Sequence, residues 1–273
     1  MNVKDGNLIE MSGICKSFGG LRVLNEVNFS AREGEVHCLI GENGAGKSTL
    51  MKILSGAYQK DEGEIWIKGK KANISNPRDG LHYGISVIYQ EFALAKHLTV
   101  AENIFIDNLG SGKAFINWRE LRAKAETLLE QLGFADIDVM TPVAELPVAY
   151  QQVVEICKAL SRNSTVLVLD EPTAVLTSKE VENLFQLIGK LKQSGVCIIY
   201  ISHRLEEIFR ICDRITVLKD GNNVCTVHVN EIDKTGLVNL MIGRDLNEFF
   251  SCQKCEYWRR RFEGGRLDRR EPV

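Results

Sequence analysis

Two short stretches carry residue types that could handle a phosphate ester. The first, GENGAGKST, fits the pattern GxxxxGK[ST], follows the apolar run VHCLI and opens a helix-like segment. Its glycines let backbone N–H groups converge on phosphate oxygens, Lys47 adds a full charge, and the Ser48 hydroxyl is a hard ligand for Mg²⁺. The pattern predicts a nucleotide site made by Gly41, Glu42, Asn43, Gly44, Ala45, Gly46, Lys47, Ser48 and Thr49.

The second stretch, VLVLDEPT, places two adjacent carboxylates at the end of an apolar run. Its apolar residues predict a buried strand, which would carry Asp170 to the carboxyl edge of a parallel sheet, where ligands bind in open α/β folds. Asp170 could hold Mg²⁺ directly or through water, and Glu171 could polarise an attacking water as a general base. The alternative is a strand end with two solvated acids, which would be unrelated to the phosphate loop.

Hydrophobic periodicity indicates the elements that must position these residues. Strand-like runs fill residues 7–40, and a helix is expected from Lys47 to Gly56. From 165 to 221, apolar runs alternate with helix-like segments, which predicts a parallel sheet covered by helices. The stretch from about 92 to 162 has helical period instead and predicts an inserted helical subdomain. One of its helices is expected to place four residues on one face: Leu121, Ala125, Leu128 and Leu132.

Composition limits the classes of function. The chain has 273 residues, 44% hydrophobic and 26% charged, as is typical of a globular protein with one large domain or two small ones. A net charge of −2 gives no global field for nucleic acid, and neither a membrane span nor a secretory signal is expected. Most of the eight cysteines lie in apolar runs, which indicates buried reduced thiols. Cys252 and Cys255 form a single CxxC, a weak metal signal.

From about residue 7 to residue 250, these features resemble the ATP-binding subunits of ABC transporters. The resemblance implies an α/β fold of the P-loop NTPase type, with a mainly parallel core sheet, an antiparallel β subdomain and an inserted α-helical subdomain. It also implies that ATP and Mg²⁺ are the ligands, with Ser48, Gln90 and Asp170 near the metal. Catalysis would then fall to Glu171, His203 and Lys47.

Three residues match positions at which the family has specific roles. Phe18 corresponds to the aromatic residue on which adenine stacks. Gln90 corresponds to a glutamine near Mg²⁺ and the attacking water, and His203 to the histidine that contacts the γ-phosphate. Taken singly, each has a structural alternative: a core aromatic residue, a solvated glutamine and a structural histidine.

Three segments resemble one subgroup of this family more specifically. YQEFALAKHLTVAENIF, ELPVAYQQVVEICKAL and LDEPTAVLT resemble the members that energise bacterial uptake of monosaccharides such as ribose, galactose or xylose. This resemblance implies a peripheral protein at the cytoplasmic face of the cell membrane. Its implied partners are transmembrane permease subunits, a sugar-binding protein and a second ATPase unit, either itself or a homologue, and no nucleic acid. Residues 91–105 would receive a helix of the permease.

The segment ELPVAYQQ stands where the family has its LSGGQ signature, which covers the γ-phosphate held by the opposite ATPase unit. Its signature residues are Leu146, Pro147, Val148, Ala149, Tyr150 and Gln151. Pro147 replaces the signature serine, so a hydroxyl and a backbone N–H are both lost, while the Ala149 N–H can still donate. We expect a weakened signature, because one charge-assisted bond to phosphate contributes about 1.5–3 kcal/mol, or roughly ten- to a hundred-fold in activation.

The resemblance accounts for residues 1–250 as one ABC ATP-binding domain, whereas members of the sugar subfamily usually carry two such units. Residues 251–273 are rich in basic side chains without periodicity and are predicted to form a loosely ordered tail. A truncated or frameshifted chain and a true single-unit protein both fit this pattern. Two functional alternatives also stay open: an ATP-binding subunit with little or no hydrolysis, and an ABC ATPase that acts outside transport, for example on nucleic acid.

Overall fold

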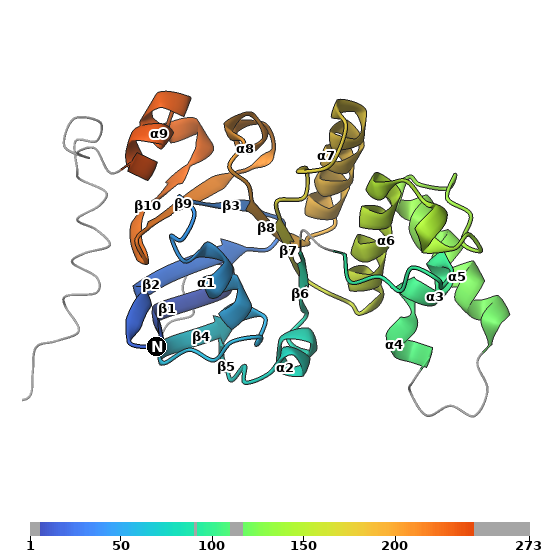
Figure 1. Cartoon of the computed structure of the whole chain (residues 1–273), viewed down its shortest axis with the longest axis horizontal. Coiled ribbons are helices and arrows are strands. Elements are labelled where there is room, and N and C mark those ends of the chain that lie inside the picture. The colour runs from blue at the N-terminus through green and yellow to red at the C-terminus, as the bar shows by residue number, and fades with distance from the viewer. Residues whose placement is uncertain (1–5, 90–91, 110–116, 243–273) are drawn as a thin grey trace, which may run out of the picture.

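The computed structural model describes residues 6–89, 92–109 and 117–242. A six-stranded sheet with the order β10-β9-β3-β8-β7-β6 runs through this part of the chain (Figure 1). Neighbouring strands from β9 to β6 are parallel, and β10 pairs antiparallel at the edge. The carboxyl ends of β3, β7 and β8 therefore meet at one edge. The strands are β3 (Val36–Ile40), β6 (Ile85–Ile88), β7 (Val166–Asp170), β8 (Cys197–Ile201), β9 (Arg214–Lys219) and β10 (Asn222–His228).

A second sheet is antiparallel throughout and has the order β2-β1-β4-β5. Its first two strands are long and are joined by Gly19 and Gly20, whose positive φ angles allow a tight turn. This hairpin and the two shorter strands lie on the side of the molecule that holds α1 (Figure 1). The strands are β1 (Asn7–Phe18), β2 (Leu21–Arg32), β4 (Glu62–Ile67) and β5 (Lys70–Ala72).

The helices fall into three groups. α1 (Lys47–Leu54) lies by the antiparallel sheet, and α2 (Pro77–His82) precedes β6. Between β6 and β7 the chain makes a helical group to one side of the sheets (Figure 1): α3 (Val100–Ile104), α4 (Ile106–Leu109), α5 (Trp118–Leu132) and α6 (Val148–Ser161). The rest follow the later strands: α7 (Ser178–Gln193), α8 (Leu205–Ile211) and α9 (Lys234–Ile242).

Two hydrophobic clusters cover the two faces of the parallel sheet. Along β7, Val166 and Val168 face the cluster shared with α1 and the antiparallel sheet. Leu167 and Leu169 face the cluster shared with α3 and α5 to α9. Successive side chains of a strand point to opposite faces, so a strand buried on both faces must be apolar at every position. The run VLVL before Asp170 meets this requirement.

The α/β class, the mainly parallel sheet and the antiparallel sheet expected from the sequence are confirmed. On α5, Ala125 and Leu132 are buried as expected, Leu121 and Leu128 are partly buried, and Leu129, outside the predicted face, is fully buried. The sequence-based prediction missed α2, α9 and β10. Helix α2 is short, and α9 has a glycine within it, which weakens the signal of each helix. The predicted tail at 251–273, with its CxxC, lies outside the described residues.

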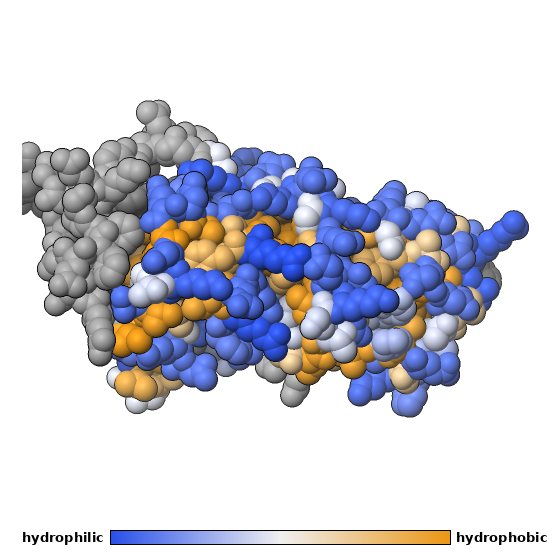
Figure 2. Space-filling model, turned by 90° about the horizontal axis from the view of Figure 1, so that it is seen from above, coloured by the Kyte–Doolittle hydropathy of each residue, from blue (hydrophilic) through white to orange (hydrophobic). Residues whose placement is uncertain are grey.

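The surface is polar over most of the face shown in Figure 2, with hydrophobic residues exposed between charged ones. Among the described cysteines, Cys15, Cys38, Cys157, Cys197 and Cys212 are buried and free, as the sequence predicts, and Cys225 is half-buried. Within the described residues, no helix has the length and apolar character needed to cross a lipid bilayer.

Candidate active site

The phosphate loop connects β3 to α1 and is built around glycines. Gly46 caps α1 in the left-handed region, at φ 97°, and a Cβ there would lie 2.5 Å from Leu24 Cδ2 of β2. Gly44 also has a positive φ, 85°, with open space at its Cβ position. Only glycine adopts these angles without strain, so the local sequence dictates a sharp turn that leaves the backbone open to an approaching anion.

Lys47, the first residue of α1, holds its ammonium group over the loop. Its Nζ donates to the carbonyl oxygens of Gly41 at 2.7 Å and Glu42 at 2.9 Å. Burial lowers the pKa of Lys47, while the nearby carboxylates of Glu171 and Asp170 act to raise it. The first turn of α1 carries no acidic side chain among its described residues. The lysine and the positive end of the helix therefore favour a bound anion such as a triphosphate.

Asp170 and Glu171 follow β7 at the same sheet edge. Burial and then repulsion from Glu171 raise the pKa of Asp170, and attraction by Lys47 and Lys52 only partly opposes this rise. Two adjacent carboxylates in a half-buried place create an excess of negative charge, which a divalent cation would offset. These residues fit a Mg²⁺ site in which Asp170 supplies one oxygen ligand. The exposed hydroxyl of Ser48, at the start of α1, could supply another.

Glu171 and His203 contact each other across two neighbouring strands. Oε1 of Glu171 lies 3.0 Å from Nδ1 of His203, the second residue after β8. The Glu171 N–H donates to the carbonyl oxygen of Ile201 at 2.9 Å, and its φ is 47°, in the left-handed region. A non-glycine residue at such an angle is strained and has to be held by its surroundings. The Glu171 side chain is 31% exposed and that of His203 is 68% exposed, so a ligand could reach both.

An aromatic pair, Phe18 and Tyr58, lies beside α1. Phe18 ends β1, and its side chain is exposed. The ring of Tyr58 meets it edge-on at 5.3 Å between centroids, and Lys16 Nζ lies 5.4 Å from the Phe18 ring centre. Lys52 of α1 lies over the Tyr58 ring. An exposed ring next to the helix that opens at the phosphate loop is suited to stacking a planar base.

The predicted signature segment lies apart from α1, at the start of α6 (Figure 1). Pro147 is the N-cap residue and makes no side-chain hydrogen bond, while its carbonyl accepts from the N–H groups of Tyr150 at 2.9 Å and Gln151 at 3.1 Å. The Gln151 amide donates to the carbonyl oxygen of Leu146 at 2.9 Å. The segment is therefore an accessible helix start, with Pro147 and Val148 exposed and Ala149 half-buried.

Gln90 lies outside the described residues, so its place near the metal stays a prediction. The segment just after it is held by α6. Lys158 Nζ donates to the carbonyl oxygen of Ala93 at 2.7 Å. Burial raises the pKa of Glu155, and Lys158, with Nζ 3.7 Å from Glu155 Oε1, opposes the rise. Helix α6 therefore holds Ala93, which lies three positions after Gln90.

Other residues around the site carry no motif of their own and were not predicted. Glu207 of α8 is buried and accepts hydrogen bonds from Thr173 and Ser202, which stand close to Glu171 and His203 in the chain. Tyr58 adds the second ring beside Phe18. The available signal was weak: hydroxyl residues within two positions of the predicted catalytic ones, and an acid one helical turn after the histidine.

Comparisons with known proteins found similar sequences. The sequence profile of the ABC transporter family matches residues 24–174. The ribose import ATP-binding protein of Clostridium tetani is 46% identical over 259 residues, which cover 93% of this chain and 50% of that protein. The xylose import ATP-binding protein of Moorella thermoacetica is 46% identical over 248 residues, which cover 90% of this chain and 49% of that protein. The chain spans about half the length of the curated relatives it matches.

Solved structures are similar as well. A crystal structure of the ADP conformation of an ATP-binding cassette of an ABC transporter has a TM-score of 0.75 at 26% identity, covering 90% of this chain and 99% of that chain. A dimeric ATP-binding cassette in a post-hydrolysis state, bound to ADP and Pi, has a TM-score of 0.69 at 26% identity, covering 81% of this chain and 98% of that chain. The fold described above is the fold of these cassettes.

Proposed function

The chain belongs to the ABC transporter family, and from this premise we propose that it binds and hydrolyses Mg²⁺-ATP to energise import of a monosaccharide. The observation that carries the proposal is the meeting of cationic and anionic groups at one edge of the parallel sheet. Lys47 follows β3, the carboxylates of Asp170 and Glu171 follow β7, and His203 follows β8. Phosphoryl transfer depends on such positioning and charge stabilisation more than on covalent chemistry.

ATP binding would use the phosphate loop and the aromatic pair. Adenine would stack on Phe18, and the triphosphate would be held by the loop N–H groups and by Lys47. Ser48 and Asp170 would hold Mg²⁺, together with Gln90, and the metal would supply charge neutralisation at the phosphate oxygens. The absence of acidic side chains from the described first turn of α1 supports an anionic ligand there.

Hydrolysis would use Glu171 as the general base. The oxygen of a water bonds to the γ-phosphorus, the bond from that phosphorus to the leaving ADP oxygen breaks, and the water proton passes to Glu171. His203 would orient the Glu171 carboxylate and contact the γ-phosphate, an assignment supported by their 3.0 Å separation. Lys47 would stabilise the negative charge that develops on the transferred group.

We infer that two ATPase units must pair for full activity. The signature of one chain lies on α6, apart from its own phosphate loop, so it could complete only the site of another unit (Figure 1). The second unit would be a copy of this chain or a homologue. The dimeric cassette structure among the similar proteins supports this arrangement.

Transport would need further partners at the cytoplasmic face of the membrane. These are transmembrane permease subunits and a sugar-binding protein, in keeping with the ribose and xylose import names of the relatives. The proposed docking surface is 91–105, and exposed Ala93 lies within it. A cysteine introduced at Ala93 should crosslink to a coupling helix of a cognate permease in the assembled transporter. Failure to crosslink in an active transporter would count against this surface.

The decisive experiment is Mg²⁺-ATP turnover by the purified chain over a series of protein concentrations. Turnover that rises faster than linearly with protein concentration, and is lost in Glu171→Gln, would support a hydrolysing pair of units. ATP binding without turnover at every concentration would favour the second candidate, a nucleotide-binding subunit that does not hydrolyse. One observation favours that candidate: Pro147 leaves the signature helix without a side-chain cap or hydroxyl.

A further inference from the structure

One buried carboxylate joins the loop after β7 to the turn after β8. Glu207, on α8, is 7% exposed. Its Oε2 accepts from Tyr200 Oη at 2.7 Å, Thr173 Oγ1 at 2.9 Å and Ser202 Oγ at 3.2 Å. Since a carboxylate oxygen can accept several hydrogen bonds whereas each hydroxyl donates only one, a single atom here links α8 to the loop after β7 and to the end of β8.

Two of the three donors stand next to the proposed catalytic residues. Thr173 is two positions after Glu171, and Ser202 immediately precedes His203. The Ser202 hydroxyl also accepts from the N–H of Arg204 at 3.1 Å, which fixes the turn on the other side of His203. Any shift of Glu207 would therefore move the backbone that carries the side chains of Glu171 and His203.

The neighbouring groups keep Glu207 in the role of acceptor. Arg204 Nη1 lies 3.3 Å from Glu207 Oε1, on the carboxylate oxygen that the hydroxyls do not use. Burial raises the pKa of Tyr200, and its hydrogen bond to Glu207 raises it further, so the Tyr200 hydroxyl keeps its proton and remains a donor. Thr173 is 1% exposed and Ser202 3% exposed, so water does not compete for these bonds.

The backbone at Glu171 is strained and needs its neighbours to hold it in place. Its φ of 47° lies in the left-handed region, which strains a non-glycine residue and persists only when the surroundings hold it. The Glu171 N–H bond to Ile201 holds one side of this residue. The bond from Thr173 to Glu207 holds the chain two residues further on.

We propose that Glu207 is a positioning residue that holds Glu171 and His203 in register with each other through Thr173 and Ser202. The inference rests on the proposed ATPase function, since it concerns the same two residues. It adds to that function a buried residue that acts through the hydroxyls of Thr173 and Ser202. Its loss should act on the hydrolytic step while ATP binding, made at the phosphate loop, is retained.

Steady-state kinetics of three variants would test this. Glu207→Gln keeps the shape but weakens the acceptor, and Thr173→Val removes only the hydroxyl that reaches it. Each should lower kcat by about ten- to a hundred-fold, the range for a small displacement of a catalytic group, with the KM for ATP changed by less than about two-fold. The double variant should fall little below the single ones, because both changes break the same link.

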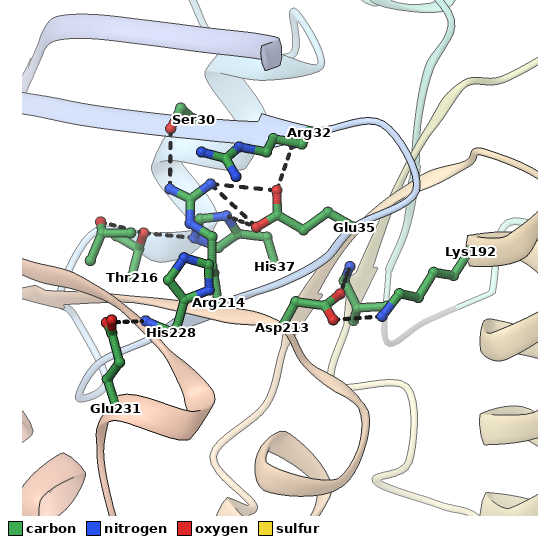
Figure 3. Close-up of polar contacts among 12 residues, drawn as sticks. Ser30, Arg32, Glu35, His37, Lys192, Asp213, Arg214, Thr216, His228 and Glu231 are labelled. Carbon is green, nitrogen blue, oxygen red and sulfur yellow. Dashed lines mark hydrogen bonds and ion pairs between the residues drawn. The ribbon is translucent and has the colours of Figure 1, made fainter. Parts of the chain in front are cut away.

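A matched control lies at the opposite edge of the sheet. Glu35, which precedes β3, is another buried carboxylate close to an arginine, with Arg214 Nη1 3.3 Å from its Oε1 (Figure 3). Glu35→Gln should lower thermal stability and leave kcat near the wild-type value. The proposal is overturned if Thr173→Val retains wild-type kcat, or if Glu35→Gln lowers kcat as much as Glu207→Gln does.

Amide hydrogen exchange separates this inference from the ATPase proposal, because it needs no turnover. Glu207→Gln should accelerate exchange in peptides covering 171–177 and 202–204, relative to peptides covering β3. If the wild-type chain binds ATP without hydrolysing it, the proposed hydrolytic function fails. Faster exchange of those two segments in Glu207→Gln would still support the positioning role of Glu207. Unchanged exchange there would overturn it.

Discussion

Nδ1 of His203 lies 3.0 Å from Oε1 of Glu171, although thirty-two positions separate the two residues in the chain. The contact exists because β7 and β8 are parallel neighbours with Asp170 opposite Ile201, so the residues after each strand leave the sheet side by side. The proposed base and the proposed phosphate-contacting group are thereby supported by one sheet edge. Several measurable consequences depend on this arrangement and on the elements around it.

Glu171→Gln should abolish hydrolysis and keep ATP binding. The amide retains the size of the carboxylate but cannot accept the water proton, and losing a general base costs about 10²–10⁴-fold in rate. Phosphate release and equilibrium nucleotide binding would be measured on the same preparation. Glu130→Gln, at an exposed position of α5, is the matched control and should behave as wild type. Equal turnover in Glu171→Gln and the control would remove Glu171 from the role of base.

Pro147→Ser should increase ATP turnover by roughly ten-fold or more, because it restores a hydroxyl and an N–H able to bond the γ-phosphate of a paired unit. The structure adds a second effect. Pro147 occupies the N-cap of α6 without a side-chain bond, so a serine there should also stabilise the protein by about 1 kcal/mol. Turnover rate, unfolding midpoint and dimerisation would be measured together.

The control for this variant is Ala144→Ser, which adds a hydroxyl at an exposed position just before the signature. It should change neither rate nor stability. Unchanged turnover in Pro147→Ser, with dimerisation also unchanged, would show that the proline does not weaken the signature.

Gly46→Ala should abolish ATP binding and destabilise the protein. The new Cβ would lie 2.5 Å from Leu24 Cδ2 and 3.1 Å from the carbonyl oxygen of Val23, at a φ of 97° that alanine rarely adopts, and left-handed strain alone costs about 1–2 kcal/mol. Gly189→Ala is the control: it lies within α7, meets nothing within 4 Å and has no positive φ. That change should stabilise the protein by about 0.5–1 kcal/mol and leave ATP binding intact. ATP affinity near wild type in Gly46→Ala would contradict the loop geometry.

The stability of the protein should fall as pH falls through the ordinary range of histidine, partly because of His37. Burial lowers the pKa of this residue, as does nearby Arg214, while Glu35 opposes them. His37 is fully buried, with Nε2 2.8 Å from Thr216 Oγ1 and Nδ1 3.4 Å from Glu35 Oε1 (Figure 3). The native imidazole therefore stays neutral where the unfolded one, with a pKa near about 6.5, takes up a proton. Since the unfolded state binds more protons, the free energy of unfolding decreases as the pH is lowered.

Urea unfolding at about pH 7.5 and about pH 5.5 would measure this loss, on either side of the ordinary histidine pKa. The pKa of Glu35 is lowered as well, despite burial, by His37, Arg214 and an N–H of Arg32, so its own contribution is lost only at more acidic pH. His37→Gln, which cannot titrate, should show a smaller loss of stability between the two conditions. His82→Gln, at an exposed position, should show the wild-type loss. Equal losses in both variants would exclude His37 as a source of the pH dependence.

The parts of the site whose geometry is local could be predicted from consecutive residues. GENGAGKST forms its loop within nine consecutive residues, and glycine angles and a helix start are sufficient to shape it. VLVLD specifies a strand buried on both faces, which places Asp170 at its end. The alternation of such strands with helices was enough to predict a parallel sheet, because each signal lies within a few residues.

The contacts between groups that are distant in the chain could not be predicted in this way. The contact of Glu171 with His203, the hydroxyls gathered by Glu207 and the hold of α6 on Ala93 join segments separated along the chain. Such meetings depend on strand register and on how helices pack over the sheet, and they leave no periodic trace in the residues involved. A buried carboxylate such as Glu207 looks like any surface acid of a short helix until the fold brings three hydroxyl groups to it.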